Sequence, residues 1–143
     1  MYKKTTLSLF LSLIFLFGVG NTFADAEWRL CVQNNIGPVF QAPNLSATVF
    51  VKIGPDDPYP SNYGTVNVVA GQQECITRSS AQIEALKAKK LQAKNLANYD
   101  FYAAFHVTSS TYTPVDCQKD VQNIFSATAV ITVNNNQLVC SFK

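Results

Sequence analysis

Alternation of apolar and polar residues recurs along the chain and predicts a protein built mainly of β-strands. The clearest run is 99–108, where one side carries Tyr99, Phe101, Ala103, Phe105 and Val107, and the other carries Asp100, Tyr102, Ala104, His106 and Thr108. Residues 28–33 alternate in the same way, runs rich in β-branched residues lie at 47–53 and 65–70, and a short strand is expected at 74–77. A period of two residues is typical of strands that bury one face. We therefore expect five or more short strands.

The end of the chain, 129–142, predicts a β-hairpin. Asn135 and Asn136 are placed for a two-residue turn, because asparagine accepts the positive φ angles that such turns need. The predicted pairs are Asn134 with Gln137, Val133 with Leu138, and Ile131 with Cys140. This register gathers the apolar residues of both strands on one face, and it directs Cys140 inward.

Two segments in the middle of the chain interrupt the strand pattern. Gly54–Gly64 contains three prolines, which cannot donate to a sheet ladder, and we expect a long surface loop there. Residues 81–96 are rich in Ala, Leu, Lys and Gln, and they predict one α-helix that ends near Asn95. Ser79 and Gln82 have the spacing of a capping box at its start.

The predicted helix has poorly separated faces. Lys87, Lys90 and Lys94 fall on the same side as Ile83. We therefore expect a helix that lies on the surface, buries only a shallow stripe and exposes its lysines to solvent.

The segment 113–116 (TPVD) resembles the start of a short second helix, with Thr as the N-cap and Pro in the first turn. Such a helix would place Cys117, Val121 and Ile124 on one face. The alternative is a loop that runs into a strand, because 125–130 is rich in small and β-branched residues.

The segment 1–26 has the organisation of a secretory signal peptide. Lys3 and Lys4 precede an unbroken apolar run over 7–19, and small polar residues follow it. About 20 apolar residues are needed to span a bilayer, so the run is too short for a membrane anchor. The pattern predicts cleavage near Ala26, or alternatively after Ala24, and a secreted or periplasmic location.

The mature chain would run over 27–143, which is the usual length of one domain. Removal of Lys3, Lys4 and Asp25 changes eleven basic and nine acidic residues to nine and eight, a net charge of about +1. Such a small charge provides no field for gathering nucleic acid or anionic lipid. No second long apolar segment follows, so we expect no membrane-spanning element in the mature form.

The four cysteines, Cys31, Cys75, Cys117 and Cys140, all lie in the exported portion. Their wide separations along the chain match no CxxC or metal-ligand spacing, so two structural disulfides are expected in an oxidising compartment. Three pairings are open. The preferred pairs are Cys31–Cys75 and Cys117–Cys140, and the rival joins Cys31 to Cys140. Each bridge would contribute roughly 3 to 4 kcal/mol to stability.

Together these patterns predict a mainly β fold over 27–143. We expect a single antiparallel β-sandwich domain, immunoglobulin-like or similar, with one inserted surface α-helix and two disulfides.

His106 is the only histidine, and it shares the polar side of its strand with Asp100 and Tyr102. A hydrolase that uses imidazole as a base would have to use His106. No GxSxG motif accompanies it, and a lone strand histidine is more often a solvated surface residue. The sequence also contains no HExxH motif and no phosphate-binding glycine loop, so we expect no metal and no cofactor.

Binding residues are predicted on the proline-rich loop and on the strand that follows the helix. The candidates are Asp56, Asp57, Tyr59, Tyr63, Tyr102 and His106. Exposed aromatics with a polar tip are typical of binding surfaces, although such rings also fold back over a sheet. The two aspartates lack the ligand spacing of a calcium loop, which favours a solvated turn.

These observations favour an exported, disulfide-stabilised, non-catalytic protein that binds an unidentified protein or glycan. One alternative is a small secreted hydrolase that uses His106. The other is a secreted toxin or effector that acts through its lysine-rich helix.

Overall fold

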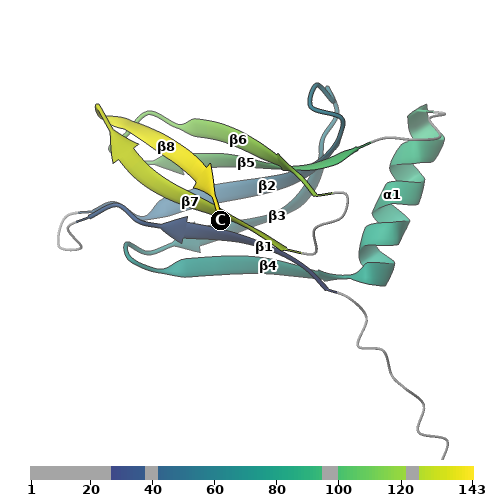
Figure 1. Ribbon diagram of the computed structural model, residues 1–143, viewed down its shortest axis with the longest axis horizontal. Coiled ribbons are helices and arrows are strands. Elements are labelled where there is room, and N and C mark those ends of the chain that lie inside the picture. The colour runs from purple at the N-terminus through teal and green to yellow at the C-terminus, as the bar shows by residue number, and fades with distance from the viewer. Residues whose placement is uncertain (1–26, 38–41, 95–99, 122–125) are drawn as a thin grey trace, which may run out of the picture.

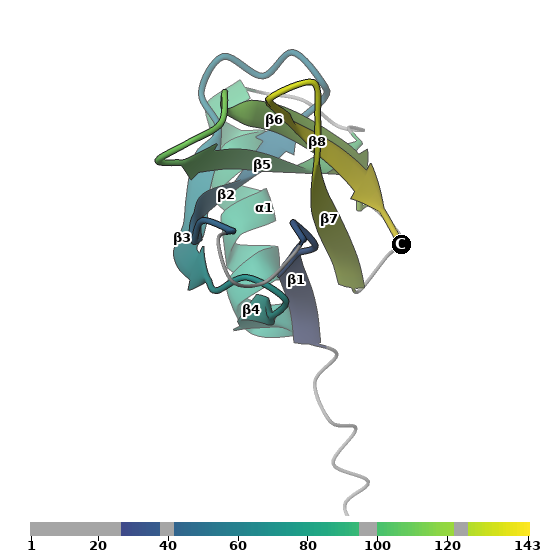
Figure 2. The same cartoon turned by 90° about the vertical axis from the view of Figure 1, so that its left-hand side faces the viewer.

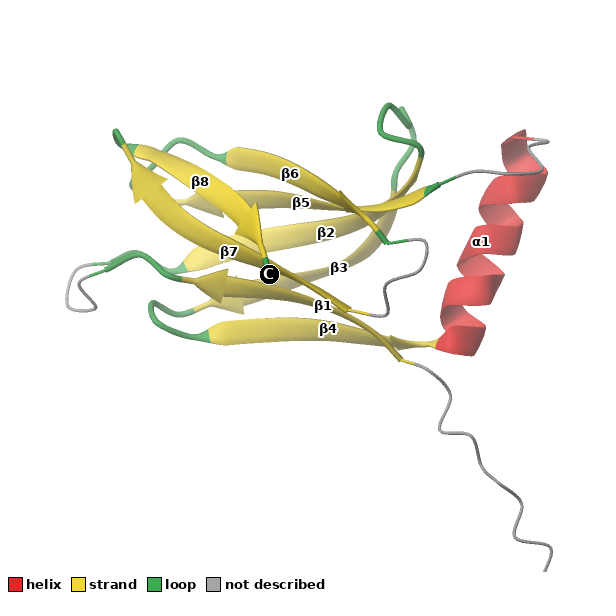
Figure 3. Ribbon diagram, in the orientation of Figure 1, coloured by secondary structure: helices red, strands yellow, loops and turns green. Residues whose placement is uncertain are grey.

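The computed structural model describes residues 27–37, 42–94, 100–121 and 126–143. The predicted signal peptide over 1–26 lies outside the described residues, as do Tyr99 and Ile124. The strands are β1 (Glu27–Asn34), β2 (Leu45–Ile53), β3 (Ser61–Val68), β4 (Gln73–Ser79), β5 (Phe101–Ser109), β6 (Val115–Asp120), β7 (Ser126–Asn134) and β8 (Gln137–Phe142), and the helix is α1 (Ser80–Lys94) (Figure 3).

The strands form two four-stranded sheets, in the orders β4-β1-β7-β8 and β3-β2-β5-β6 (Figure 1). Every neighbouring pair is antiparallel except β1 and β7, which run parallel. The first sheet is therefore mixed, and the second is antiparallel throughout, so the expected antiparallel pairing holds for every contact except that of β1 with β7. Short hairpins force neighbouring strands to run antiparallel, whereas β1 and β7 are separated by most of the chain and no local turn sets their direction.

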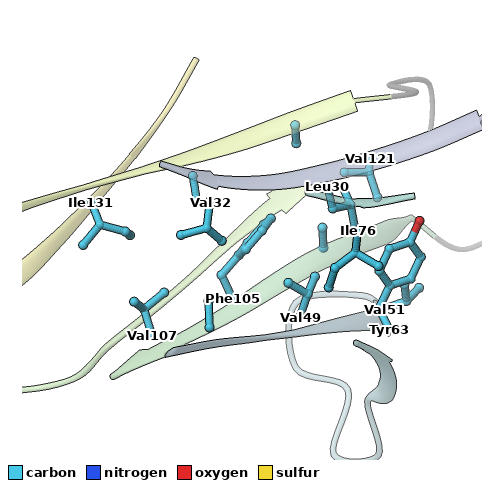
Figure 4. Close-up of a cluster of buried hydrophobic side chains, with 14 of the residues drawn as sticks. Leu30, Val32, Val49, Val51, Tyr63, Ile76, Phe105, Val107, Val121 and Ile131 are labelled. Atoms are coloured by element: carbon cyan, nitrogen blue, oxygen red, sulfur yellow. The ribbon is translucent and has the colours of Figure 1, made fainter. Parts of the chain in front are cut away.

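The inner faces of the two sheets share one apolar core (Figure 4). β2 buries every second residue from Leu45 to Ile53, and β5 does the same from Phe101 to Val107. Among the described residues, Phe105 is the largest whose exposure is below 2%. The two-residue period of these segments therefore reports their burial correctly.

The helix α1 lies across one end of the two sheets, behind the strands in the view along them (Figure 2). Its predicted capping box is confirmed: the Ser79 backbone N–H donates to Gln82 Oε1 at 3.0 Å, and the Gln82 N–H donates to Ser79 Oγ at 3.3 Å. Ile83 is buried against the core. The expectation of a solvated lysine stripe is wrong at Lys90, which is also buried.

The chain forms a strand where a short second helix was one of two predicted alternatives. Residues 115–120 are β6, which pairs along β5. In this strand Val115, Cys117 and Lys119 are half-buried, and the residues between them are exposed. A hydrogen-bonded partner strand thus overrides the local helix-start signal.

The proline-rich loop is shorter than predicted. β3 begins at Ser61, inside the Gly54–Gly64 segment, and Pro60 immediately precedes it. All three prolines of the segment lie outside the strand, which agrees with their inability to donate to a ladder. Tyr63 is consequently a strand residue and not a loop residue.

The C-terminal hairpin has the predicted register. Ile131 faces Cys140, Val133 faces Leu138, and Asn134 faces Gln137. Asn135 and Asn136 have positive φ angles of 47° and 63°. The turn chemistry and the apolar pattern therefore agree on one pairing.

The disulfides join the preferred cysteine pairs. Cys31 and Cys75 face each other across β1 and β4, with a Cα–Cα distance of 4.0 Å. Cys117 of β6 and Cys140 of β8 are 6.3 Å apart at Cα. Because β6 and β8 are edge strands of different sheets, the second bridge ties the two sheets together along one side.

Candidate functional site

The outer face of the sheet β3-β2-β5-β6 carries two of the six predicted binding residues, Tyr102 and His106. The strand registers align its side chains in four rows: Asn67, Ser46 and Thr108; Thr65, Thr48, His106 and Asp116; Asn62, Phe50, Ala104 and Gln118; and Lys52, Tyr102 and Asp120. We call this surface the outer face. It lies opposite the core side of the same strands, because side chains alternate along a strand.

A cleft of about 390 Å³ hollows the outer face around Ala104. The side chain of Ala104 ends at Cβ, whereas its cross-strand neighbours Phe50 and Gln118 are larger. Further lining comes from Lys52, Asp57, Pro60, Phe105, His106, Asp116 and Cys117. The cleft therefore combines aromatic surface with cationic, anionic and amide groups.

His106 and Asp116 form a cross-strand pair in this cleft. His106 Nδ1 lies 2.7 Å from Asp116 Oδ1, and the two side chains are 46% and 81% exposed. The sequence pattern placed Asp100 on the same side of the strand as His106, but the carboxylate that contacts His106 is that of Asp116. The β5–β6 register brings Asp116 opposite His106, although the two residues are not neighbours in the sequence.

Lys52 links two walls of the cleft. Its Nζ donates to Gln118 Oε1 at 2.8 Å, and it also donates to the Pro55 carbonyl oxygen. The lysine therefore connects β2 to β6 across β5, and it holds the start of the 54–60 loop beside the outer face.

Asp57 organises the 54–60 loop from inside. Its side chain is completely buried, and its two oxygens accept hydrogen bonds from the N–H groups of Ile53 at 2.9 Å and Tyr59 at 3.0 Å. Lys90 Nζ lies 2.8 Å from the same carboxylate and 2.9 Å from the Tyr59 carbonyl oxygen. The interpretation of Asp57 as part of a solvated turn is therefore wrong, whereas Asp56 is exposed.

The candidate tyrosines have three different environments. Tyr59 is 79% exposed at the tip of the loop, and Tyr102 is half-buried on the outer face. Tyr63 is 3% exposed, and its hydroxyl donates to the Trp28 carbonyl oxygen at 3.0 Å. The expectation that Tyr63 belongs to an exposed loop surface is wrong, because its ring packs in the core.

Burial also changes the acidity of Tyr63. Removal from water disfavours the phenolate and raises the pKa of Tyr63 from 10.0 to about 12, although the positive charge of Arg78 acts in the opposite direction. Arg78 lies over the tyrosine ring, 5.4 Å from its centroid. Tyr63 is therefore a protonated structural hydrogen-bond donor at neutral pH.

The structure brings His106 and the 54–60 loop to the same cleft, and it adds four residues that the sequence reasoning did not select. These are Phe50, Lys52, Asp116 and Gln118. A signal for two of them was present, because the alternation in 47–53 places Phe50 and Lys52 on the polar side of a strand. Asp116 and Gln118 carried no such signal while 113–124 had two competing interpretations.

The lining of the cleft limits its chemistry. None of its side chains carries a hydroxyl group, and Cys117 is bonded to Cys140. In the part of the chain that the structure describes, no three His, Cys, Asp or Glu side chains are grouped as metal ligands would be. Over the same residues, no helix combines the length and apolar character needed to cross a membrane.

No protein-family model, curated protein or solved structure matches this chain.

Proposed function

We propose that this chain is an exported, disulfide-stabilised binding protein that holds a protein or glycan ligand without catalysing a reaction. The cleft around Ala104 is the observation that carries this proposal. A concave site with an aromatic surface and a few converging polar groups is the usual form of a ligand site. The two disulfides fit an oxidising compartment, which agrees with the leader-like segment 1–26.

The framework of the cleft supports a binding role. Its side chains project mainly from paired strands rather than from a long loop, and Asp116 and Gln118 flank the bridged Cys117. A rigid surface loses little conformational entropy when it binds a ligand. We further propose that the two packed sheets form a sandwich of the immunoglobulin-like kind.

The hydrolase alternative is favoured by one observation, the short contact between His106 and Asp116. A carboxylate can orient an imidazole for use as a base, but nucleophilic catalysis also needs a hydroxyl or thiol within reach. The side chains that line the cleft supply neither, and the Thr48 hydroxyl, which faces His106 from the neighbouring strand, is hydrogen-bonded to Thr65 with an Oγ1–Oγ1 distance of 3.2 Å. A binding function requires no nucleophile, so it accounts for the cleft with the side chains that are present.

The effector alternative through α1 is less well supported than the sequence suggests. Lys90 is buried against Asp57, and Lys87 Nζ lies 4.9 Å from the centroid of the Trp28 ring. Both lysines thus interact within the chain, which reduces the positive charge that α1 presents to a membrane or an acidic partner.

The proposal is tested with two variants of the oxidised protein, produced by export from its own leader. Phe50→Ala removes the aromatic wall of the cleft, and Val69→Ala removes an exposed apolar side chain that does not line the cleft. Both variants and the wild type are probed against immobilised glycans and peptides. We expect Phe50→Ala to lose at least about tenfold in affinity for any ligand found, which corresponds to about 1.4 kcal/mol.

Val69→Ala should bind like the wild type. If Phe50→Ala retains full affinity while its thermal unfolding is unchanged, the cleft is not the contact surface. A His106→Ala variant distinguishes the hydrolase alternative, because it would abolish turnover of a substrate and only weaken simple binding.

A further inference from the structure

We propose that the ligand is a linear, uncharged oligosaccharide that lies along β2 and β5, over the cleft and a second groove on the same outer face. This inference rests on the proposed binding function and specifies its ligand. Three observations carry it: the polar composition of the second groove, its alignment with the cleft, and the balance of charge between them.

The second groove lies at the end of the outer face that is remote from the 54–60 loop. It has a volume of about 580 Å³, and its polar lining consists of Asn44, Ser46, Asn67, Thr108, Ser109 and Ser110. Each of these side chains carries an amide or a hydroxyl, and none carries a charge. Groups of this kind both donate and accept hydrogen bonds, as sugar hydroxyls do.

Some of these groups already serve the fold. Ser109 Oγ accepts the N–H groups of Thr111 at 3.3 Å and Tyr112 at 2.8 Å, which holds the turn after β5. Asn44, Asn67 and Ser110 are exposed at the rim. These three residues are therefore positioned to meet a ligand.

The groove and the cleft are aligned along the strands. Ser46 faces Thr108 in the groove, Thr48 faces His106 in the next row, and Phe50 faces Ala104 in the cleft. The path along β2 from Ser46 to Lys52 covers six residue steps, about 20 Å at the usual rise of about 3.3 Å per residue. An extended ligand could therefore contact both depressions at once, whereas a single sugar could contact only one.

The charges on this path favour a neutral polymer. Among the side chains of the four rows, Lys52 carries a positive charge, and Asp116 and Asp120 carry negative charges. A surface with this balance offers no cationic track for a polyanion. A sugar ring presents an apolar C–H face and a rim of hydroxyls, which match the Phe50 ring and the neutral polar groups beside it.

The length of the ligand provides the decisive measurement. Neutral linear oligosaccharides of the cello-, malto-, xylo- and chito- series, each as a dimer and a hexamer, are titrated into the oxidised protein by calorimetry. We expect the hexamer of one series to bind at least about tenfold more tightly than its dimer, because it fills both depressions. Its affinity should change little between low and high salt, since few charged contacts form.

Two variants locate the contacts. Asn67→Ala in the groove should weaken the hexamer several-fold and leave the dimer unchanged, provided that the dimer occupies the cleft. Phe50→Ala should weaken both ligands. The exposed Val69→Ala variant, which lies outside both depressions, should match the wild type.

The outcomes separate this inference from the proposed function. Equal affinities for hexamer and dimer, or a steep loss of affinity with salt, would overturn the extended neutral ligand. If no sugar binds but a peptide binds and is lost in Phe50→Ala, the glycan inference fails and the binding cleft stands. If binding of every ligand is insensitive to Phe50→Ala, both proposals fail.

Discussion

Lys90 of α1 and Asp57 of the 54–60 loop form a buried ion pair, with Nζ 2.8 Å from Oδ2 and side-chain exposures of 8% and 0%. This contact fastens the helix to the loop that borders the cleft. Asp57 also accepts the Ile53 and Tyr59 N–H groups, so one carboxylate organises the loop and receives the helix. The arrangement links the helix at the end of the two sheets to the candidate site.

Removal of the lysine charge should destabilise the fold strongly. Lys90→Met removes the cation that lies 2.8 Å from the buried Asp57 carboxylate, and breaking a buried pair in this way typically costs about 3 to 5 kcal/mol. Urea unfolding monitored by Trp28 fluorescence gives the change in the free energy of unfolding. Lys89→Met, an exposed neighbour on the same helix, is the control and should change stability by less than about 0.5 kcal/mol. Equal effects of the two substitutions would show that the pair adds no stability.

Tyr63 should make stability depend on alkaline pH. Its folded pKa of about 12 lies above the unfolded value near 10, so the folded state keeps a proton that the unfolded chain has lost. The contribution is fully present below about pH 10 and is lost as the pH rises towards 12. Each pKa unit corresponds to about 1.4 kcal/mol, so the decrease is at most about 3 kcal/mol.

The Tyr63→Phe variant tests this contribution. It should be about 1 kcal/mol less stable at pH 7, because the hydrogen bond to the Trp28 carbonyl is lost, and it should lack the Tyr63 share of the alkaline decrease. Tyr59→Phe, at an exposed tyrosine, should retain the wild-type pH profile. Identical profiles for Tyr63→Phe and the wild type between about pH 9 and 12 would contradict the assignment.

Gly64 should resist substitution because the Ile76 side chain of β4 occupies the space beside it. A Cβ at this position would lie 2.9 Å from Ile76 Cδ1, and the residue has a φ angle of 153° at an irregularity of the β2–β3 ladder. We expect Gly64→Ala to lower the free energy of unfolding by about 1 to 3 kcal/mol. Gly54→Ala tests backbone strain alone, since Gly54 has a positive φ and no atom near the added Cβ.

A double-mutant comparison isolates the steric part of the Gly64 effect. Ile76→Val removes the Cδ1 atom, so Gly64→Ala should cost less in that background than in the wild type. Equal costs in the two backgrounds would mean that the backbone angle, and not the contact with Ile76, sets the penalty.

The Cys117–Cys140 bridge should hold the β6 wall of the cleft in place. The double variant Cys117→Ala/Cys140→Ala should lose about 3 kcal/mol of stability through the freedom gained by its unfolded chain. Because Asp116 and Gln118 lie beside Cys117 at a sheet edge, hydrogen exchange of the β6 amides should also accelerate. The matched variant Cys31→Ala/Cys75→Ala should lose similar stability and keep β6 protected at temperatures where it is folded. Equal protection of β6 in both variants would contradict this role.

The sequence by itself determined those features that depend on neighbouring residues. The Asn135-Asn136 turn and the apolar alternation on both sides of it are sufficient to define the C-terminal register. Ser79 and Gln82 likewise define the start of α1 through a reciprocal pair of hydrogen bonds within one turn. Such signals are local, so they survive in any tertiary setting that accepts the element.

The tertiary structure decided which remote residues meet. His106 finds Asp116 only because β6 pairs with β5, and Lys90 becomes buried only because α1 closes over the loop that holds Asp57. The parallel contact between β1 and β7 and the burial of Tyr63 have the same origin. Periodicity reports which side of a strand is buried, but the partner of that strand is chosen by packing between segments far apart in the chain. The candidate cleft therefore depends on strand register and sheet order. The alternation in 47–53 indicates only that Phe50, its aromatic wall, lies on the polar side of its strand.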